Sequence, residues 1–148
     1  VVVVNLGQEP EVALHRILVP IKDLSASARE QVELALRVIN SADENQRTRI
    51  TLLHVHDPRF SGQDRRWMED QLIRWRPAGI PAERFHIVIV RGPGIDGSIH
   101  RLSRDHDLVI LRTQRRRVAG LPIPGSDRTS QLISQLPCAS MVISDPLV

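Results

Sequence analysis

The residues most able to do chemistry are arginines gathered in one short segment late in the chain. Arg112 is followed by Arg115, Arg116 and Arg117, and Gly125-Ser126 comes soon after. Arginine stays charged at physiological pH and its guanidinium forks onto phosphate or carboxylate, so the cluster favours binding of an anion. Gly125-Ser126 is predicted to open a helix, and the free N–H groups at the start of a helix attract anions. Two plainer interpretations stay open: a solvated charged loop, or docking to an acidic partner surface.

Histidine and cysteine give weaker signals. His54 and His56 alternate along an apolar run, so their side chains share one face of a strand, but no third ligand lies close in sequence. We therefore predict a structural role for the pair and no metal site. Cys138 follows Pro137, and we expect it to be a small buried residue. Nothing places a histidine base beside the thiol and no acid–base pair of carboxylates stands out, so no catalytic residue and no enzyme activity are predicted.

The composition is that of a globular chain. The chain has 148 residues, of which 41% are hydrophobic and 25% charged, and this is enough for one ordinary core. No apolar run approaches the roughly 18 residues that a membrane helix needs. With 3% aromatic residues and no tyrosine, a base-stacking surface is not expected, which argues against a nucleic-acid partner. The single cysteine rules out an internal disulfide framework and fits a reducing cytoplasm.

Five apolar runs rich in branched residues must position these side chains, and we predict them to be strands. Their near-continuous apolar pattern is typical of parallel strands that helices cover on both faces. The runs are Ile17–Ile21, Ile50–Val55, His86–Val90, Leu108–Leu111 and Ser140–Ile143.

The segments between the strands predict helices. Ser27 and Glu30 favour a capping box at the start of the first one. Trp67 and Trp75, eight residues apart in the second, have a spacing that lets them share a face, and packing in the core or at an interface is the default interpretation. The alternation of strands and helices predicts a doubly wound parallel sheet, whose ligand site lies at the carboxyl ends of strands. The apolar stripes are Val32, Ala35, Leu36 and Ile39; Met68, Leu72 and Trp75; Ile95, Ile99 and Leu102; and Leu132, Ile133 and Leu136, the last in a helix from about Ser126.

The chain divides into an N-terminal arm or linker, residues 1–14, and one domain, residues 15–148. Val1–Val4 have strong strand propensity, and we leave open whether they pair as an extra strand or are disordered. The chain opens on valine rather than methionine, which we interpret as a cut or processed end of a longer protein.

The order and spacing of the predicted strands resemble the universal stress protein pattern. The resemblance covers roughly residues 15–144. It implies a Rossmann-like α/β fold of the adenine nucleotide alpha hydrolase type, with a five-stranded parallel sheet of order 3-2-1-4-5 between helical layers. The residues that carry it are Arg16-Ile-Leu-Val-Pro-Ile21, Leu52-Leu-His-Val-His-Asp-Pro58, Asp107-Leu-Val-Ile-Leu111, Gly125-Ser126 and Pro137-Cys-Ala-Ser-Met-Val-Ile143.

The resemblance also implies a nucleotide site, from which this chain departs. Family members that bind ATP carry Gly-x2-Gly-x9-Gly and then Ser or Thr after the fourth strand. Gly125 and Ser126 match the end of this motif, but Arg112 and Arg115 stand at its first two glycines. These side chains either block the usual ATP pose or replace its contacts, and both alternatives stay open.

The first loop of the implied site departs as well. Many members place aspartate directly after the first strand, whereas this chain has Lys22 there and Asp23 one residue later. The site implied for ATP, another adenine nucleotide or another anion consists of Lys22, Asp23, Val55, Arg112, Arg115, Gly125 and Ser126.

A narrower resemblance concerns Leu111–Gly120 and Thr129–Cys138, which are similar to stress-protein-like tails of cyanobacterial membrane transport proteins, particularly ClC-type chloride channels. It implies a cytoplasmic regulatory or ligand-sensing domain attached to a transporter. The family resemblance implies a homodimer through the last strand, at Ser140, Met141, Val142 and Ile143. Two alternatives stay open: an oligomerisation or interaction module without nucleotide binding, and a free-standing ATP-binding stress protein.

Overall fold

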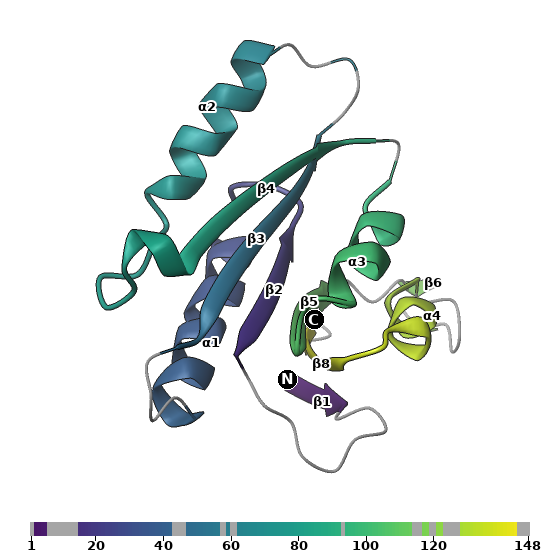
Figure 1. Ribbon diagram of the computed structural model, residues 1–148. Coiled ribbons are helices and arrows are strands. Elements are labelled where there is room, and N and C mark those ends of the chain that lie inside the picture. Colours follow the sequence, from purple (N-terminus) through teal and green to yellow (C-terminus); the bar gives the residue numbers. More distant parts are fainter. Residues whose placement is uncertain are drawn as a thin grey trace.

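A twisted six-stranded sheet forms the centre of the computed structural model, which describes residues 2–5, 15–42, 47–56, 59, 62–92, 94–113, 117–118, 121–122 and 128–144 (Figure 1). Five strands are parallel, in the spatial order β4-β3-β2-β5-β8, and this confirms the predicted order 3-2-1-4-5. The sixth strand, β1, lies antiparallel at the β8 edge. The bounds are β1 Val2–Asn5, β2 Arg16–Ile21, β3 Arg49–His56, β4 Phe85–Arg91, β5 Leu108–Thr113 and β8 Ala139–Ser144.

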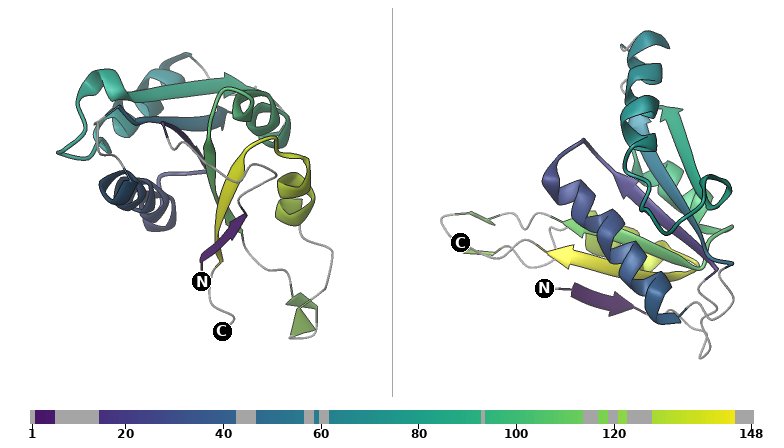
Figure 2. Two further views of the ribbon diagram at one scale, coloured as in Figure 1. Left: turned by 60° about the horizontal axis from the view of Figure 1, so that its bottom comes forward. Right: turned by 90° about the vertical axis from the view of Figure 1, so that its left-hand side faces the viewer.

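Two helical layers cover the sheet (Figures 1 and 2). On one face, α1 (Ala26–Ala42) and α2 (Gly62–Ile73) pack over one apolar cluster of the sheet. On the other, α3 (Asp96–Ser103) and α4 (Arg128–Gln135) pack over a second cluster. A short 3-10 helix, η1 (Ala82–Arg84), leads into β4. The central strand β2 is buried from Ile17 to Ile21 because its side chains alternate between these two clusters, which explains its unbroken apolar sequence.

The start of α1 differs from the predicted capping box. The helix begins at Ala26, and the Oγ of Ser25 accepts a hydrogen bond from the N–H of Ala28 at 3.2 Å. The capping serine is therefore Ser25, and the box assigned to Ser27 and Glu30 is wrong. Glu30 instead contacts β5, as described below.

The inner face of α2 was predicted correctly in part. Leu72 is fully buried, and Met68 and Trp75 pack against the same cluster. Trp67 does not share their face, since 55% of its side chain is exposed. The two tryptophans do not share a face, because α2 ends at Ile73 and Trp75 lies in the following turn, where helical spacing no longer fixes its direction. Packing in the core is confirmed for Trp75.

The segment after β5 contains a small antiparallel hairpin, β6 (Arg117–Val118) with β7 (Leu121–Pro122), where the sequence predicted only a loop. Ser126, the predicted start of the last helix, lies outside the described residues, which resume with α4 at Arg128. Within the described ranges, no helix has the length and apolar character that crossing a membrane requires.

Asp107 fastens the amino ends of the two central strands. Its Oδ2 accepts hydrogen bonds from the backbone N–H groups of His15 at 3.0 Å and Arg16 at 2.9 Å. Its own N–H donates to the carbonyl of Arg16 at 2.8 Å. This residue therefore fixes where β5 begins relative to β2.

The sequence left open whether the valines of the N-terminal arm form an extra strand, and the structure shows that they do in β1. Val2 to Asn5 pair with Ile143 to Ser140 of β8, so the valines form an extra strand. They occupy the edge through which a homodimer was predicted. That homodimer stays a prediction, and pairing at this edge would require β1 to leave it.

Removal of β1 should both weaken the fold and uncover the β8 edge. Val3→Pro takes an N–H from the strand, so we expect the free energy of unfolding to fall by about 1–3 kcal/mol. Exposed strand edges pair with other chains, so deletion of residues 1–5 should increase the fraction of the chain that is dimeric.

Urea unfolding and sedimentation velocity measure the two effects. Val3→Thr keeps the strand propensity and should behave as the unaltered chain does. The prediction is contradicted if Val3→Pro leaves the free energy of unfolding unchanged and if the intact and shortened chains have the same oligomeric state.

Candidate functional site

The strands β2 and β5 separate toward their carboxyl ends. They pair at Ile17 with Leu108 and at Leu18 with Val109, whereas β2 and β3 pair along six residues. The chain leaves β2 toward α1 and β3, and it leaves β5 toward α4 and β8, so the strand order reverses between them. This is the place where an open α/β sheet forms a crevice for a ligand.

The amide of Gln31, from the second turn of α1, closes the base of this crevice. The side chain is 3% exposed, and its Nε2 donates to the carbonyl of Pro20 at 2.9 Å and to that of Ile110 at 3.1 Å. Both hydrogens of one amide thus serve carbonyls on the two separating strands. An unsatisfied buried carbonyl would cost about 1–3 kcal/mol, so this polar contact is a structural requirement. Gln31 is not among the site residues predicted from the sequence, although a glutamine on the buried side of an apolar stripe was a usable signal.

Arg112 lies at the mouth of the crevice and folds back onto α1. Its Nη1 donates to the carbonyl of Ser27 and to Oε2 of Glu30, both at 3.0 Å. The guanidinium side chain is 16% exposed and the Glu30 side chain 60% exposed. The predicted anion-binding arginine is therefore a half-buried strand residue that already holds a carboxylate.

Lys22 and Asp23 form the bend between β2 and α1, and both are exposed. The Oδ1 of Asp23 accepts a hydrogen bond from the backbone N–H of Ser25 at 3.0 Å. Hydrogen bonds from Ser25 lower the pKa of Asp23, and Lys22 adds to this effect. The carboxylate thus stabilises the turn that leads into α1, while the ammonium of Lys22 stays in solvent beside the crevice.

Of the other predicted site residues, Val55 lies in the described part of the chain, and it lies away from Arg112. Val55 packs into the cluster under α3 and α4, on the opposite face of the sheet from Gln31 and α1. Its neighbour across the end of β4 is Gly92, whose N–H donates to the carbonyl of His56 at 3.2 Å. Arg115, Gly125 and Ser126 lie outside the described residues. The structure thus brings Lys22, Asp23 and Arg112 to one edge and places Val55 on the far face.

His54 and His56 share the α1 face at the end of β3, as predicted. They are 6% and 3% exposed, and their ring centroids are 6.3 Å apart. The Nδ1–H of His54 points to the carbonyl of Ile21 at 3.3 Å, on the strand that leads to Asp23. Burial lowers the pKa of His54, an effect that the hydrogen bond to Ile21 only partly offsets. No group of three or more potential metal ligands occurs in the described part of the chain.

Cys138 is half-buried beside the cluster under α3 and α4. Burial raises the pKa of its thiol to about 11. The thiol is therefore protonated at neutral pH and is a poor nucleophile, which agrees with a packing role.

The lowered pKa of His54 predicts a dependence of stability on pH. In the unfolded chain the imidazole titrates near 6.5, and in the folded chain it titrates lower. The unfolded state therefore binds more protons in the window just below 6.5, so the free energy of unfolding should fall as the pH drops through it. Asp23, also with a lowered pKa, acts only in a more acidic window below its ordinary 3.8.

Urea unfolding across this pH range tests the assignment. His54→Asn should flatten the decline below pH 6.5, whereas the matched change His86→Asn, at an exposed position of β4, should keep it. Equal slopes in the unaltered chain and in His54→Asn would show that another group causes the decline.

The chain is similar in sequence to one curated protein and in fold to several solved structures. No protein-family model matches the chain. The sequence is 27% identical over 146 residues to the Na(+)/H(+) antiporter NhaS5 of Synechocystis sp. (strain ATCC 27184 / PCC 6803 / Kazusa). The alignment includes 99% of this chain but spans only 20% of the antiporter, and that relative is not a chloride channel.

Solved structures are similar in fold at low sequence identity. A universal stress protein in complex with cAMP has a TM-score of 0.59 and 13% identity, over 90% of this chain and 98% of that one. A putative universal stress protein from Pseudomonas aeruginosa UCBPP-PA14 has a TM-score of 0.67 and 16% identity, over 97% of this chain and 52% of that one. With its parallel order 3-2-1-4-5 between two helical layers, the chain has the fold of the universal stress proteins.

Proposed function

We propose that this chain is the cytoplasmic regulatory domain of a membrane transport protein and that it senses a phosphate-bearing ligand at the edge formed by Lys22, Asp23 and Arg112. The observation that carries the proposal is the alignment of nearly the whole chain with one fifth of a Na(+)/H(+) antiporter. The chain has a hydrophobic core on each face of its sheet. A unit with its own core is suited to be a domain attached to a transporter, because a domain can in principle fold by itself.

The charges at the crevice support a phosphate-bearing ligand. Arg112 holds Glu30 through a contact that is exposed on the carboxylate side, and exposed ion pairs contribute only about 0–1 kcal/mol. A phosphate that binds the guanidinium bidentately forms two charge-assisted hydrogen bonds, which compete with the bonds to Ser27 and Glu30. The ligand would thus take Arg112 from Glu30 and gain the charge of Lys22.

The exchange offers a mechanism for signalling. Arg112 joins the end of β5 to the first turn of α1 through Ser27 and Glu30. A ligand that binds the guanidinium would break the hydrogen bonds between Arg112 and α1. The hydrogen bonds of Gln31 would keep the second turn of α1 in place. Adenine nucleotides are the first ligands to consider, since a protein of the same fold was solved with cAMP.

A second candidate function is an interaction module that binds no nucleotide. It is favoured by the 16% exposure of Arg112, which fills with a side chain the place where a glycine would leave room for phosphates. The ligand measurements below distinguish it from the first.

If the chain is attached to a transporter, the same gene must encode membrane-spanning helices. The full reading frame that encodes it should contain membrane-spanning helices, and the product should sediment with membranes from which alkaline carbonate does not release it. The chain expressed alone serves as the control and should remain in the supernatant. A full-length product that carries no membrane helix would disprove the attachment.

Ligand binding should stabilise the chain. ATP, ADP, AMP, cAMP, cyclic dinucleotides and inorganic phosphate are compared by thermal unfolding, where free ligand at a hundred times Kd adds about 2.7 kcal/mol. Calorimetry on variants then tests the mechanism. Glu30→Gln releases Arg112 and should tighten binding, whereas Arg112→Gly should weaken it at least about tenfold, or 1.4 kcal/mol.

Arg49→Gly is the matched control, because Arg49 is an exposed arginine at the amino end of β3, away from the crevice. It should leave the affinity unchanged. Tighter binding in Arg112→Gly would mean that the arginine blocks the site, and the absence of any ligand effect would favour the interaction module.

A further inference from the structure

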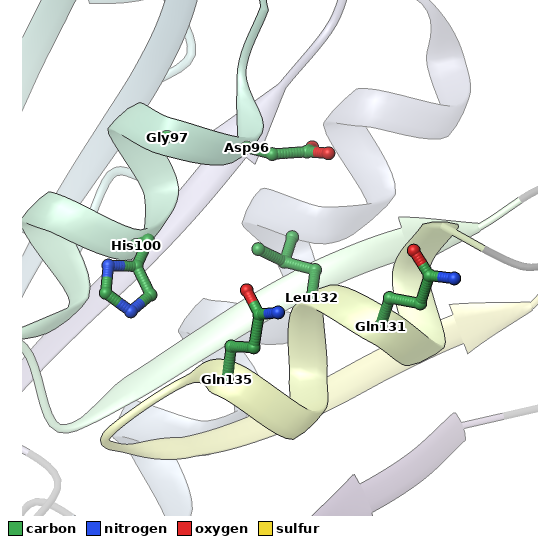
Figure 3. Close-up of a pocket in the computed structure, with 6 residues that line it drawn as sticks. All are labelled: Asp96, Gly97, His100, Gln131, Leu132 and Gln135. Atoms are coloured by element: carbon green, nitrogen blue, oxygen red, sulfur yellow. The ribbon is translucent and has the colours of Figure 1, made fainter.

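A hollow of about 320 Å³ lies between α3 and α4, on the face of the sheet opposite α1 (Figure 3). Its size falls at the small end of the range for small-molecule sites, about 300–1,000 Å³. The residues that line it are Asp96, Gly97, His100, Gln131, Leu132 and Gln135.

The two helices present polar side chains to one another across this hollow. Asp96 and His100 are four residues apart on α3, and Gln131 and Gln135 are four apart on α4, so each pair lies on one side of its helix. Figure 3 shows Gln131 and Gln135 on either side of Leu132, with Asp96 extending from α3 over the same gap. Leu132 is 9% exposed and forms an apolar floor.

Gly97 lines the hollow from the first turn of α3. An added Cβ would meet nothing within 4 Å, so packing within the chain does not require glycine. The missing side chain leaves room in the hollow and lets a ligand approach the backbone of the helix.

The side chains define the class of ligand. The carboxylate of Asp96 accepts hydrogen bonds, the two carboxamides donate and accept, and a neutral imidazole does both. Among the lining residues that the structure describes there is no arginine or lysine, so these residues offer an anion no countercharge. We propose that the hollow binds a small uncharged ligand rich in hydroxyl groups, such as a sugar or polyol, because each hydroxyl both donates and accepts.

The hollow is separate from the crevice at Arg112, and the proposal does not depend on binding there. Arg112 belongs to the α1 side, whereas the hollow opens above the second core cluster. If no ligand binds at the crevice, binding at the hollow can still be measured, and the reverse also holds.

Amide NMR spectra of the whole chain test the proposal, with glucose, myo-inositol and glycerol as probes and with putrescine and sulfate as charged comparisons. We expect at least one hydroxyl-rich probe to cause saturable shifts at Gly97, His100 and Gln131. Gly97→Leu fills the space and should weaken binding by about tenfold or more. Gly62→Leu is the matched control, because Gly62 also lies in a helix with open space around it.

Should Gly97→Leu not fold, Gln131→Ala at the exposed rim replaces it, with Gln63→Ala on α2 as its control. Binding that survives Gly97→Leu or Gln131→Ala would overturn the proposal. So would saturable shifts with putrescine or sulfate alone, or no saturable shift with any probe.

Discussion

The separation of β2 from β5, held by the side chain of Gln31, is the constraint on which the rest of the structure depends. Asp107 fixes the two strands together at their amino ends, and their paired register reaches only Leu18 and Val109. Beyond that point Pro20 has no N–H to offer a neighbour. The amide of Gln31 then serves carbonyls on both strands, and this ties α1 to both halves of the sheet.

This arrangement gives the candidate site its character. Because α1 must stay near β5 to supply Gln31, its first turn also lies within reach of Arg112. The guanidinium therefore joins a strand to a helix instead of standing free in a loop. The charge of Arg112 is paired with Glu30 within the chain, so the proposed ligand would compete with Glu30. Such competition would link occupancy of the proposed site to the position of α1.

The two faces and the edge of the sheet serve different purposes. The α1 face carries the crevice and the buried histidine pair, whereas the α3 and α4 face carries the polar hollow. The edge at β8 is covered by β1, so the backbone groups of the last parallel strand have partners within the chain. Figure 2 shows β1 beside β8 in both views.

The sequence by itself determined the strands, their order by resemblance, and the inner faces of the helices, because apolar periodicity is a local signal. It also identified Arg112, Lys22 and Asp23 as residues at the carboxyl edge. The tertiary structure decided the partners: Gln31 with Ile110, Arg112 with Glu30, and β1 with β8. Local patterns could not reveal these, since each joins residues about 80 or more positions apart, and only the folded sheet brings them within hydrogen-bonding distance.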